Sequence, residues 1–154
     1  MIKEMVTEEF LAELSSKKPT PGGGGAAALG GATGVSLGQM VINLTLGKKK
    51  YADVEEEMKD LNGQLEALKA EFLHLADEDA QVFAPLAAAY SLPGTTDEEK
   101  AHKAAVLEGH LLTASLVPIQ VMEAAGKALH IMDILADKGS RMAVRDVGVA
   151  VQFI

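Results

Sequence analysis

The sequence lacks several residue types on which common binding and catalytic sites depend. None of its 154 residues is cysteine, which excludes disulfide bonds, a cysteine-ligated zinc and a thiol nucleophile. It also has no tryptophan, and aromatic residues make up only 4% of the chain. With 48% apolar residues in a chain of this length, we expect one soluble globular domain whose core consists of alanine, leucine, valine and methionine.

Positive charge is scarce as well. Lysine and arginine number 14 against 22 aspartates and glutamates, which gives a formal net charge of −8. Nucleic-acid binding requires a basic face that contacts phosphates, so we expect no nucleic-acid partner. The N-terminal sequence MIKEMVTEEF carries acidic residues where a secretory signal has an apolar core. These features predict a cytoplasmic protein.

Charge is absent altogether from residues 21–47, PGGGGAAALGGATGVSLGQMVINLTLG. A run of this length could span a membrane, but its many glycines and interspersed polar residues make transfer into lipid unfavourable. Because glycine has low helix propensity, a helix here must pack closely against other helices. The small residues that would share one face of it are Ala27, Gly31, Gly34 and Gly38. We therefore predict a buried central helix that ends near Gly47, and no membrane partner.

The other segments carry helix signals and no strand pattern. Thr7, followed by two glutamates, predicts a helix N-cap, and Thr96 with Glu99 predicts a capping box. A later helix is expected to end at Gly139, and residues 141–154 allow one more. The sequence therefore predicts an all-α fold, an antiparallel bundle of about five to six helices, in a single domain over residues 1–154.

Residues 100–116 are expected to form a helix that turns its leucines inward. The side chains concerned are Leu107, Leu111, Leu112 and Leu116. Pro118 follows, and since proline removes a helical hydrogen bond, we expect it to kink or break the helix.

A four-three alternation of apolar residues between Val54 and Tyr90 is the clearest helix signal in the chain. Its first members are Met58, Leu61, Leu65, Leu68, Phe72 and Leu75. Asp79 stands where the alternation requires an apolar residue, whereas Asp77 and Glu78 lie off this seam and are expected to be solvated. Burying a carboxylate is costly unless it is paired or reaches a ligand, and burial raises its pKa, as suits a general acid or base. The pattern leaves open both a catalytic carboxylate and a structural one, which would be ion-paired across the bundle or hydrogen-bonded to a helix terminus.

Two charged or flexible segments flank the uncharged run. Lys48, Lys49 and Lys50 follow the expected helix end, where they either offset the helix dipole or attract an anion. The glycines at 22–25 open the helix, where exposed backbone N–H groups can hold an anion or let a flat ligand approach. Their spacing matches neither a P-loop nor a dinucleotide-binding fingerprint. Both interpretations stay open for each segment.

Metal-ligand spacing is absent from the sequence. Glu71 and His74 form one Glu-x-x-His pair, but a di-iron bundle needs a second such pair and two more glutamates. The remaining histidines, at 102, 110 and 130, show no ligand spacing. We therefore predict no metal site.

Several motifs occur in order along nearly the whole chain: TPGGGG, AAALGGA, NLTLGKKKY, LADEDAQVF and LPGTTDEEK. Together they resemble the cyclodeaminase/cyclohydrolase family, which comprises the C-terminal domain of formiminotransferase-cyclodeaminase and the stand-alone bacterial methenyltetrahydrofolate cyclohydrolases. The resemblance implies a helical homodimer that acts on one-carbon-substituted tetrahydrofolate without a metal or any cofactor beyond that substrate.

The resemblance implies one of two reactions. The first is hydrolysis of 5,10-methenyltetrahydrofolate to 10-formyltetrahydrofolate, and the second is cyclisation of 5-formiminotetrahydrofolate with loss of ammonia. The absence of a formiminotransferase domain favours the cyclohydrolase.

The resemblance also implies roles for particular residues. Asp79 aligns with the family's catalytic aspartate. The positions that match the folate-binding cleft are Gly22, Gly23, Gly24, Lys48, Lys49 and Asp146. In this interpretation the glycines and the lysines form two edges of one cleft, and the central helix forms its floor.

The chain ends on the apolar run VGVAVQFI. An exposed apolar end is unfavourable, and members of the resembled family continue through at least one more helix. We therefore expect a chain truncated at its C-terminus or one whose end is buried in an oligomer. The alternative to an enzyme is then a non-catalytic folate-binding or dimerisation module.

Overall fold

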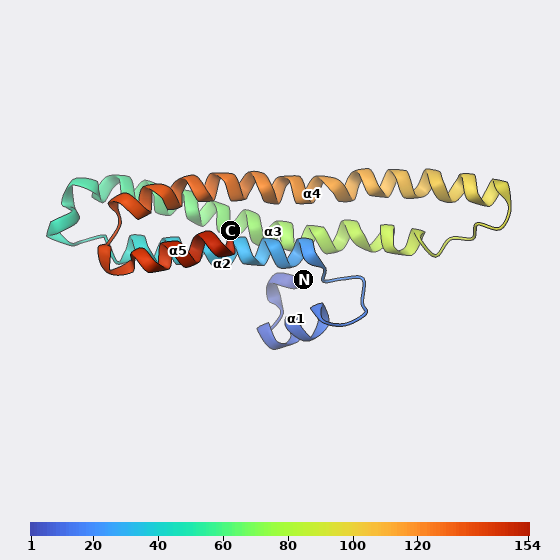
Figure 1. Cartoon of the computed structure of the whole chain (residues 1–154), viewed down its shortest axis with the longest axis horizontal. Helices are drawn as coiled ribbons and strands as arrows, with labels where there is room; N and C mark the ends of the chain where they lie inside the picture. The colour runs from blue at the N-terminus through green and yellow to red at the C-terminus, as the bar shows by residue number, and fades with distance from the viewer.

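The computed structural model describes all residues, 1–154, and contains helices and no strand. Successive long helices run in opposite directions (Figure 1). The all-α prediction is therefore confirmed. The α-helices are α1 (Thr7–Leu14), α2 (Gly23–Asn43), α3 (Glu55–Ala89), α4 (Asp97–Lys138) and α5 (Val144–Phe153), and the 3₁₀ turns are η1 (Ile2–Glu4), η2 (Lys49–Val54) and η3 (Arg141–Ala143).

The uncharged run forms α2, which packs against α3, α4 and α5. A Cβ added to Gly31 would lie 2.5 Å from the Phe72 ring, and one added to Gly38 would lie 3.0 Å from Leu65. These small residues let α3 approach, as predicted, but Ala27 is exposed and lies off this contact. The helix also ends at Asn43, earlier than expected, and Gly47 with φ +72° closes the following turn.

The apolar seam predicted in α3 forms the centre of the core. All six residues from Met58 to Leu75 in the alternation are buried. The first five of them cluster with the second half of α4, whose buried side chains there are Ala124, Ala128, Ile131, Met132 and Leu135. Leu75 belongs to a second, smaller cluster. This seam could be predicted from the sequence because the two faces of α3 differ from each other in polarity.

The first half of α4 departs from prediction in two ways. The helix runs unbroken through Pro118, an exposed residue, because the turns on both sides keep their own hydrogen bonds and proline removes only one. Leu111, Leu112 and Leu116 are 48%, 69% and 52% exposed rather than inward-facing. Beyond Gly23, where α2 starts, α3 and α4 continue as a two-helix arm (Figure 1), and the face of α4 that carries Leu112 and Leu116 has no helix packed against it.

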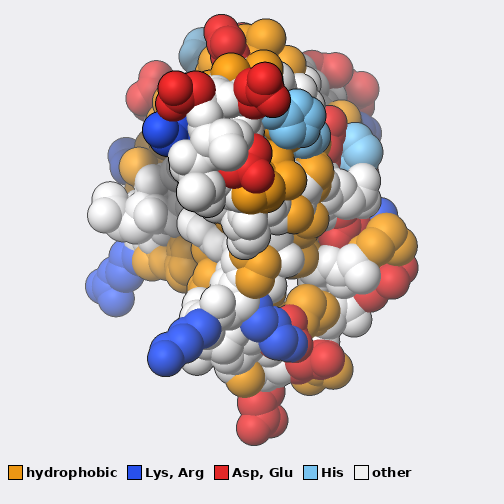
Figure 2. All heavy atoms as spheres, turned by 90° about the vertical axis from the view of Figure 1, so that its right-hand side faces the viewer, with side chains coloured by type: hydrophobic (Ala, Val, Ile, Leu, Met, Phe, Trp, Pro, Cys, Tyr) orange, Lys and Arg blue, Asp and Glu red, His pale blue; other side chains and the backbone are white.

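The tip of this arm is acidic. Figure 2 looks onto it end-on: acidic side chains gather at the top of the view, with apolar side chains between them. The first turn of α4 contributes Asp97, Glu98 and Glu99. The predicted capping box is present, because Glu99 N–H donates to Thr96 Oγ1 and the Glu99 carboxylate accepts from the Thr96 N–H. The backbone N–H groups of Thr96 and Thr95 both donate to the Glu99 carboxylate and thereby lower its pKa.

At the N-terminus, the predicted cap is displaced by one residue. Thr7 is the first residue of α1, and Val6 is the N-cap without a side-chain hydrogen bond.

By length and composition alone, α2 and α4 could each cross a membrane. Half of the apolar stretch in α2 is buried within the bundle, against 11% of that in α4. Packing therefore accounts for α2 and leaves an apolar surface on α4.

Candidate functional site

Asp79 in α3 contacts the first turn of α2. Its Oδ2 accepts the backbone N–H of Gly25 at 2.9 Å. Helical N–H groups in the first turn have no partner within the helix, and an N-cap side chain normally accepts this one. The N-cap here is Gly22, which has no side chain. Asp79 therefore caps α2 from the neighbouring helix, beside the positive end of the helix dipole.

Gly24 makes this contact possible. A Cβ on Gly24 would lie 2.5 Å from Cγ of Asp79 and 2.9 Å from its Oδ2, closer than real Cβ atoms approach. Gly25 is also confined, because its Cβ would lie 3.0 Å from Ile2 Cδ1. By contrast, a Cβ on Gly23 would meet no atom within 4 Å. The glycine run is thus required at the positions that hold the carboxylate.

Asp79 is accessible as well as fixed. Its side chain is only partly buried, and Oδ1 makes no hydrogen bond within the chain. One oxygen is therefore anchored while the other can meet a ligand or water. The seam pattern placed this carboxylate on the apolar face of α3, and it is only partly buried there because α2 begins at this level and leaves one side of Asp79 open.

A cavity of about 360 Å³ lies in front of Asp79. Helix α3 contributes Asp79, Phe83 and Leu86, which are spaced by four and three residues and so share one face. Helix α4 supplies Leu111, Ala114, Ser115 and Pro118, and the loop before α2 together with the first residues of α2 supplies Pro19, Gly22, Gly23 and Gly24. Asp79 and Ser115 carry the only polar side chains of this lining. The arrangement is a small apolar cleft with one free carboxylate oxygen, which suits proton transfer to a bound ligand.

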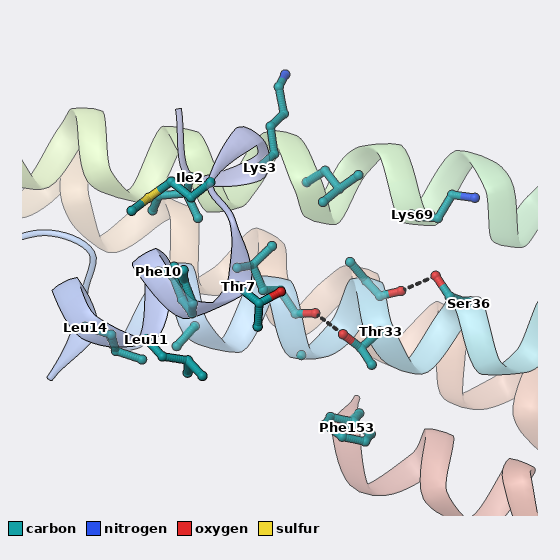
Figure 3. Close-up of a pocket in the computed structure, with 16 residues that line it drawn as sticks. Ile2, Lys3, Thr7, Phe10, Leu11, Leu14, Thr33, Ser36, Lys69 and Phe153 are labelled. Carbon is teal, nitrogen blue, oxygen red and sulfur yellow. Dashed lines mark hydrogen bonds between the residues drawn. The ribbon is translucent and has the colours of Figure 1, made fainter.

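A larger cavity, of about 650 Å³, lies between α1, α2, α3 and the end of α5 (Figure 3). It shares no residue with the Asp79 cleft. Its polar side chains are mostly engaged: Thr33 and Ser36 donate to carbonyls of their own helix, and Lys69 bonds Gln39 and Glu66. It contains no carboxylate, so the smaller cleft is the better candidate for chemistry.

Asp77 corrects a second prediction. It was expected to be solvated, but it is only 5% exposed. Lys3 N–H donates to its Oδ1 at 3.3 Å, and Lys3 Nζ lies 3.5 Å from its Oδ2 without forming a hydrogen bond. The reason is the turn η1, which folds over α3 and covers Asp77 while it places Ile2 against Gly25. Asp77 therefore ties the N-terminal segment to the helix that carries Asp79.

The other predicted binding residues lie at the opposite end of α2. Lys48 and Lys49 follow this helix and are exposed, and its 21 residues separate them from the glycines by about 30 Å. Asp146 lies in the first turn of α5. The end of α5 contacts Gly30, and its start follows the turn where Ser140 N–H bonds Thr45, so Asp146 is also at the lysine end. Within one chain, glycines and lysines do not border one cleft.

The lysine end is held together by hydrogen bonds. The buried Thr45 hydroxyl donates to Val41 O at 2.7 Å and accepts the N–H of Ser140 at 2.9 Å. The N–H of Arg141 donates to the Tyr51 hydroxyl oxygen at 3.1 Å, and this lowers the pKa of Tyr51 from its usual value near 10. Lys50 Nζ lies 5.4 Å from the centre of the Tyr51 ring. These contacts join the α2–α3 connection to the α4–α5 turn.

Side chains capable of binding a metal do not cluster. No group of three or more histidines, aspartates or glutamates has a geometry that could hold an ion. His74 lies 3.5 Å from Glu78, on an exposed face of α3.

Sequence comparison decides the family. The family model described as formiminotransferase-cyclodeaminase matches residues 6–154. The chain belongs to this family. The family predicted from the motifs is therefore confirmed, together with its helical fold.

Individual relatives within the family carry two different names. The chain is 43% identical to a methenyltetrahydrofolate cyclohydrolase of Methylorubrum extorquens, over 94% of this chain and 69% of that protein. It is 31% identical to the formimidoyltransferase-cyclodeaminase of Mus musculus, over 92% of this chain and 26% of that protein. The crystal structure of a formiminotetrahydrofolate cyclodeaminase from Thermotoga maritima superposes with a TM-score of 0.85 at 29% identity, over 99% of this chain and 72% of that one.

Sequence reasoning missed the other wall of the cleft. Phe83 falls within the apolar alternation predicted between Val54 and Tyr90 and was not singled out from it, and Ser115 and Pro118 were not linked to Asp79. The signal for Phe83 was available, since it lies four residues after Asp79 and hence on the same face of α3. No local pattern indicates which turn of α4 faces Asp79, because that depends on the length of the connection between the two helices.

Proposed function

We propose that this chain hydrolyses 5,10-methenyltetrahydrofolate to 10-formyltetrahydrofolate, with Asp79 as general base and acid. The observation that carries the proposal is the Asp79 carboxylate, which has one oxygen fixed by Gly25 N–H and the other free in a cleft. The reactive part of the substrate is a cation, and a carboxylate in an apolar cleft attracts it. The cyclohydrolase relative supports this reaction over others in the family, because its identity to this chain is higher than that of the cyclodeaminases cited.

The proposed reaction needs only proton transfers through Asp79. Its free Oδ1 takes a proton from water as the water oxygen bonds to the amidinium carbon, which gives a neutral carbinolamine and a protonated Asp79. Asp79 then returns this proton to N5 as the carbon–N5 bond breaks. The hydroxyl proton leaves to solvent as the formyl C=O forms. One substrate cation and one water thus give one neutral product and one proton.

The glycines at 22–24 take a supporting role in this proposal. They line the cleft without side chains, so a flat ring can lie against the start of α2. The volume of about 360 Å³ is at the small end of the range for ligand pockets. We therefore expect the cleft to take the fused rings and to leave the glutamate tail outside. Substrate binding by Lys48, Lys49 and Asp146 stays a prediction, which in this geometry requires a second copy of the chain.

We also propose that the chain forms a homodimer and works in the cytoplasm. The exposed apolar residues on α4, which include Leu112 and Met122 at 69% and 64% exposure, supply a surface that a second copy would cover. Sedimentation velocity tests the dimer: we expect a single species near twice the chain mass, and a monomer across micromolar concentrations would contradict it.

The alternative reaction is cyclisation of 5-formiminotetrahydrofolate with release of ammonia, which the names of the mouse and Thermotoga relatives favour. The same carboxylate would serve, because that ring closure also requires a proton to be moved. The two reactions are separated by substrate: loss of methenyl absorbance reports the hydrolysis, and coupled detection of ammonia reports the cyclisation.

We expect the whole chain to accelerate loss of methenyl absorbance well above the rate without protein and to release no ammonia from the formimino substrate. Ammonia release as the faster reaction would overturn the cyclohydrolase assignment in favour of the cyclodeaminase. Binding of either folate without turnover would instead identify a non-catalytic folate-binding module.

A further inference from the structure

We propose that Phe83 is the residue that recognises the flat cationic ring of the substrate and distinguishes it from the neutral product. This inference rests on the proposed function. It assigns a role to an aromatic residue that neither the catalytic step nor the packing of the bundle uses.

Packing does not account for Phe83. The chain has four phenylalanines, and two of them, Phe10 and Phe72, belong to the two hydrophobic core clusters. Phe83 belongs to neither cluster and is only partly buried. A large aromatic side chain held partly open in a chain with so few aromatics is more readily explained by a ligand than by the core.

Its position places it beside the reacting group. Phe83 lies one helical turn after Asp79, and both side chains line the same cleft. It is the only aromatic residue of that lining. Ala114 and Pro118, small or rigid residues of α4, line the same cleft. A ligand whose amidinium carbon is at Asp79 therefore has its rings against Phe83.

The charge of the substrate gives Phe83 a specific effect. The methenyl substrate carries a positive charge delocalised over N5, the bridging carbon and N10, and the face of an aromatic ring attracts such a cation. The formyl product is neutral, so this attraction ends when the reaction does. Phe83 should thus strengthen binding of the substrate more than binding of the product, which favours product release.

The test compares Phe83→Leu with Phe83→Tyr. Leucine keeps an apolar side chain but removes the ring, whereas tyrosine keeps the ring. We expect Phe83→Leu to raise KM for 5,10-methenyltetrahydrofolate about tenfold, as the loss of a partly desolvated cation–π contact implies. The inhibition constant of 10-formyltetrahydrofolate should change less than about threefold. Phe83→Tyr should keep both values near those of the unmodified chain.

Phe153→Leu is the matched control, since Phe153 is an exposed aromatic residue on the larger cavity and its loss should change neither constant. An equal change in substrate and product affinity with Phe83→Leu would show a purely apolar contact and would overturn the proposal. Unchanged affinity for both substrate and product would also overturn the proposal. Circular dichroism checks the fold, and if Phe83→Leu does not fold, Phe83→Met replaces it.

A second measurement separates this inference from the proposed function. If the unmodified chain binds folates without turnover, equilibrium titration with the methenyl cation and with the neutral formyl compound gives the same comparison. A selective loss of cation binding in Phe83→Leu would then support Phe83 although the hydrolase assignment had failed. Equal losses would overturn the role of Phe83 whatever the reaction is.

Discussion

The two ends of α2 differ in which of their groups are held in place by hydrogen bonds. At the glycine end, the Asp79 carboxylate from α3 is fixed to the backbone of α2 by one oxygen, and its side chain lines a cavity. At the lysine end, hydrogen bonds join the α2–α3 connection to the α4–α5 turn, while Lys48 and Lys49 are exposed and line none of the cavities.

This difference indicates where chemistry is possible. A catalytic group needs a fixed position, an unpaired atom and a space for the ligand, and only the glycine end offers all three. The lysine end carries charge without a fixed position or a cavity. The run of lysines therefore marks only a charged surface, whereas the run of glycines marks the end of α2 that carries the candidate site.

The largest expected effect comes from Asp79→Asn. Asparagine has nearly the same shape and can still accept the Gly25 N–H, but it cannot take a proton from water. We expect kcat to fall by about 10² to 10⁴-fold, the usual contribution of a general acid–base group, with little change in thermal stability. Asp77→Asn is the contrasting variant: it loses the ion pair with Lys3. Its main effect should be a lower unfolding temperature, with only a small change in kcat. Retention of over a tenth of the activity by Asp79→Asn would exclude Asp79 as the base.

A smaller but still large effect is expected from Gly24→Ala. Its Cβ would displace the carboxylate of Asp79, and misplacement of a catalytic group by about 1 Å can lower the rate on the order of 100-fold. The methyl group added in Gly23→Ala meets no atom within 4 Å, so it should leave Asp79 in place and kcat unchanged. Because Gly23 lines the cleft, the methyl group should raise KM. Gly126→Ala, in an open position on α4, controls for helix propensity. Equal kcat values for the Gly23 and Gly24 variants would contradict the proposed positioning.

Part of this comparison could be predicted from the sequence. The seam of α3 isolated Asp79 because the period of a helix is readable in a strongly amphipathic segment. The separation of the two ends was also predictable, since a helix that joins Gly22 to Lys48 must be about 30 Å long or more. The expectation that glycines and lysines border one cleft neglected that length.

Other features depend on contacts between distant parts of the chain. Asp77 is buried because Lys3, 74 residues away, folds over it, and no local pattern encodes this. Leu112 and Leu116 of α4 are exposed because no other helix of the chain packs on the face that carries them. The same limit applies to the cleft: its α4 wall is set by the register of two long helices, which the sequence of either one does not specify.

The lysine end should respond to mutation in stability rather than catalysis. Thr45→Val keeps the shape of the side chain but leaves the buried N–H of Ser140 without its acceptor. An unsatisfied buried donor costs about 1–3 kcal/mol, measurable by urea denaturation. Thr33→Val, at an exposed position of α2, should change the free energy of unfolding by less than about 0.5 kcal/mol. A large loss of kcat in folded Thr45→Val protein would show that the two ends are not separate.

The smallest effect is expected from replacing Lys48 and Lys49 together by alanine. Within one chain these side chains lie about 30 Å from the cleft, beyond the Debye length of about 8 Å at physiological salt, so they attract the anionic tail of a folate only weakly. We expect unchanged kcat and a rise in KM of less than about fivefold that disappears at high salt. A salt-resistant rise of more than tenfold would mean direct contact with the substrate. Since one chain cannot provide that contact, a second copy would then have to place its lysine end over the Asp79 cleft. Mixing the double-lysine variant with Asp79→Asn should in that case restore activity. The mixed dimer would contain one site in which Asp79 and the two lysines are all intact.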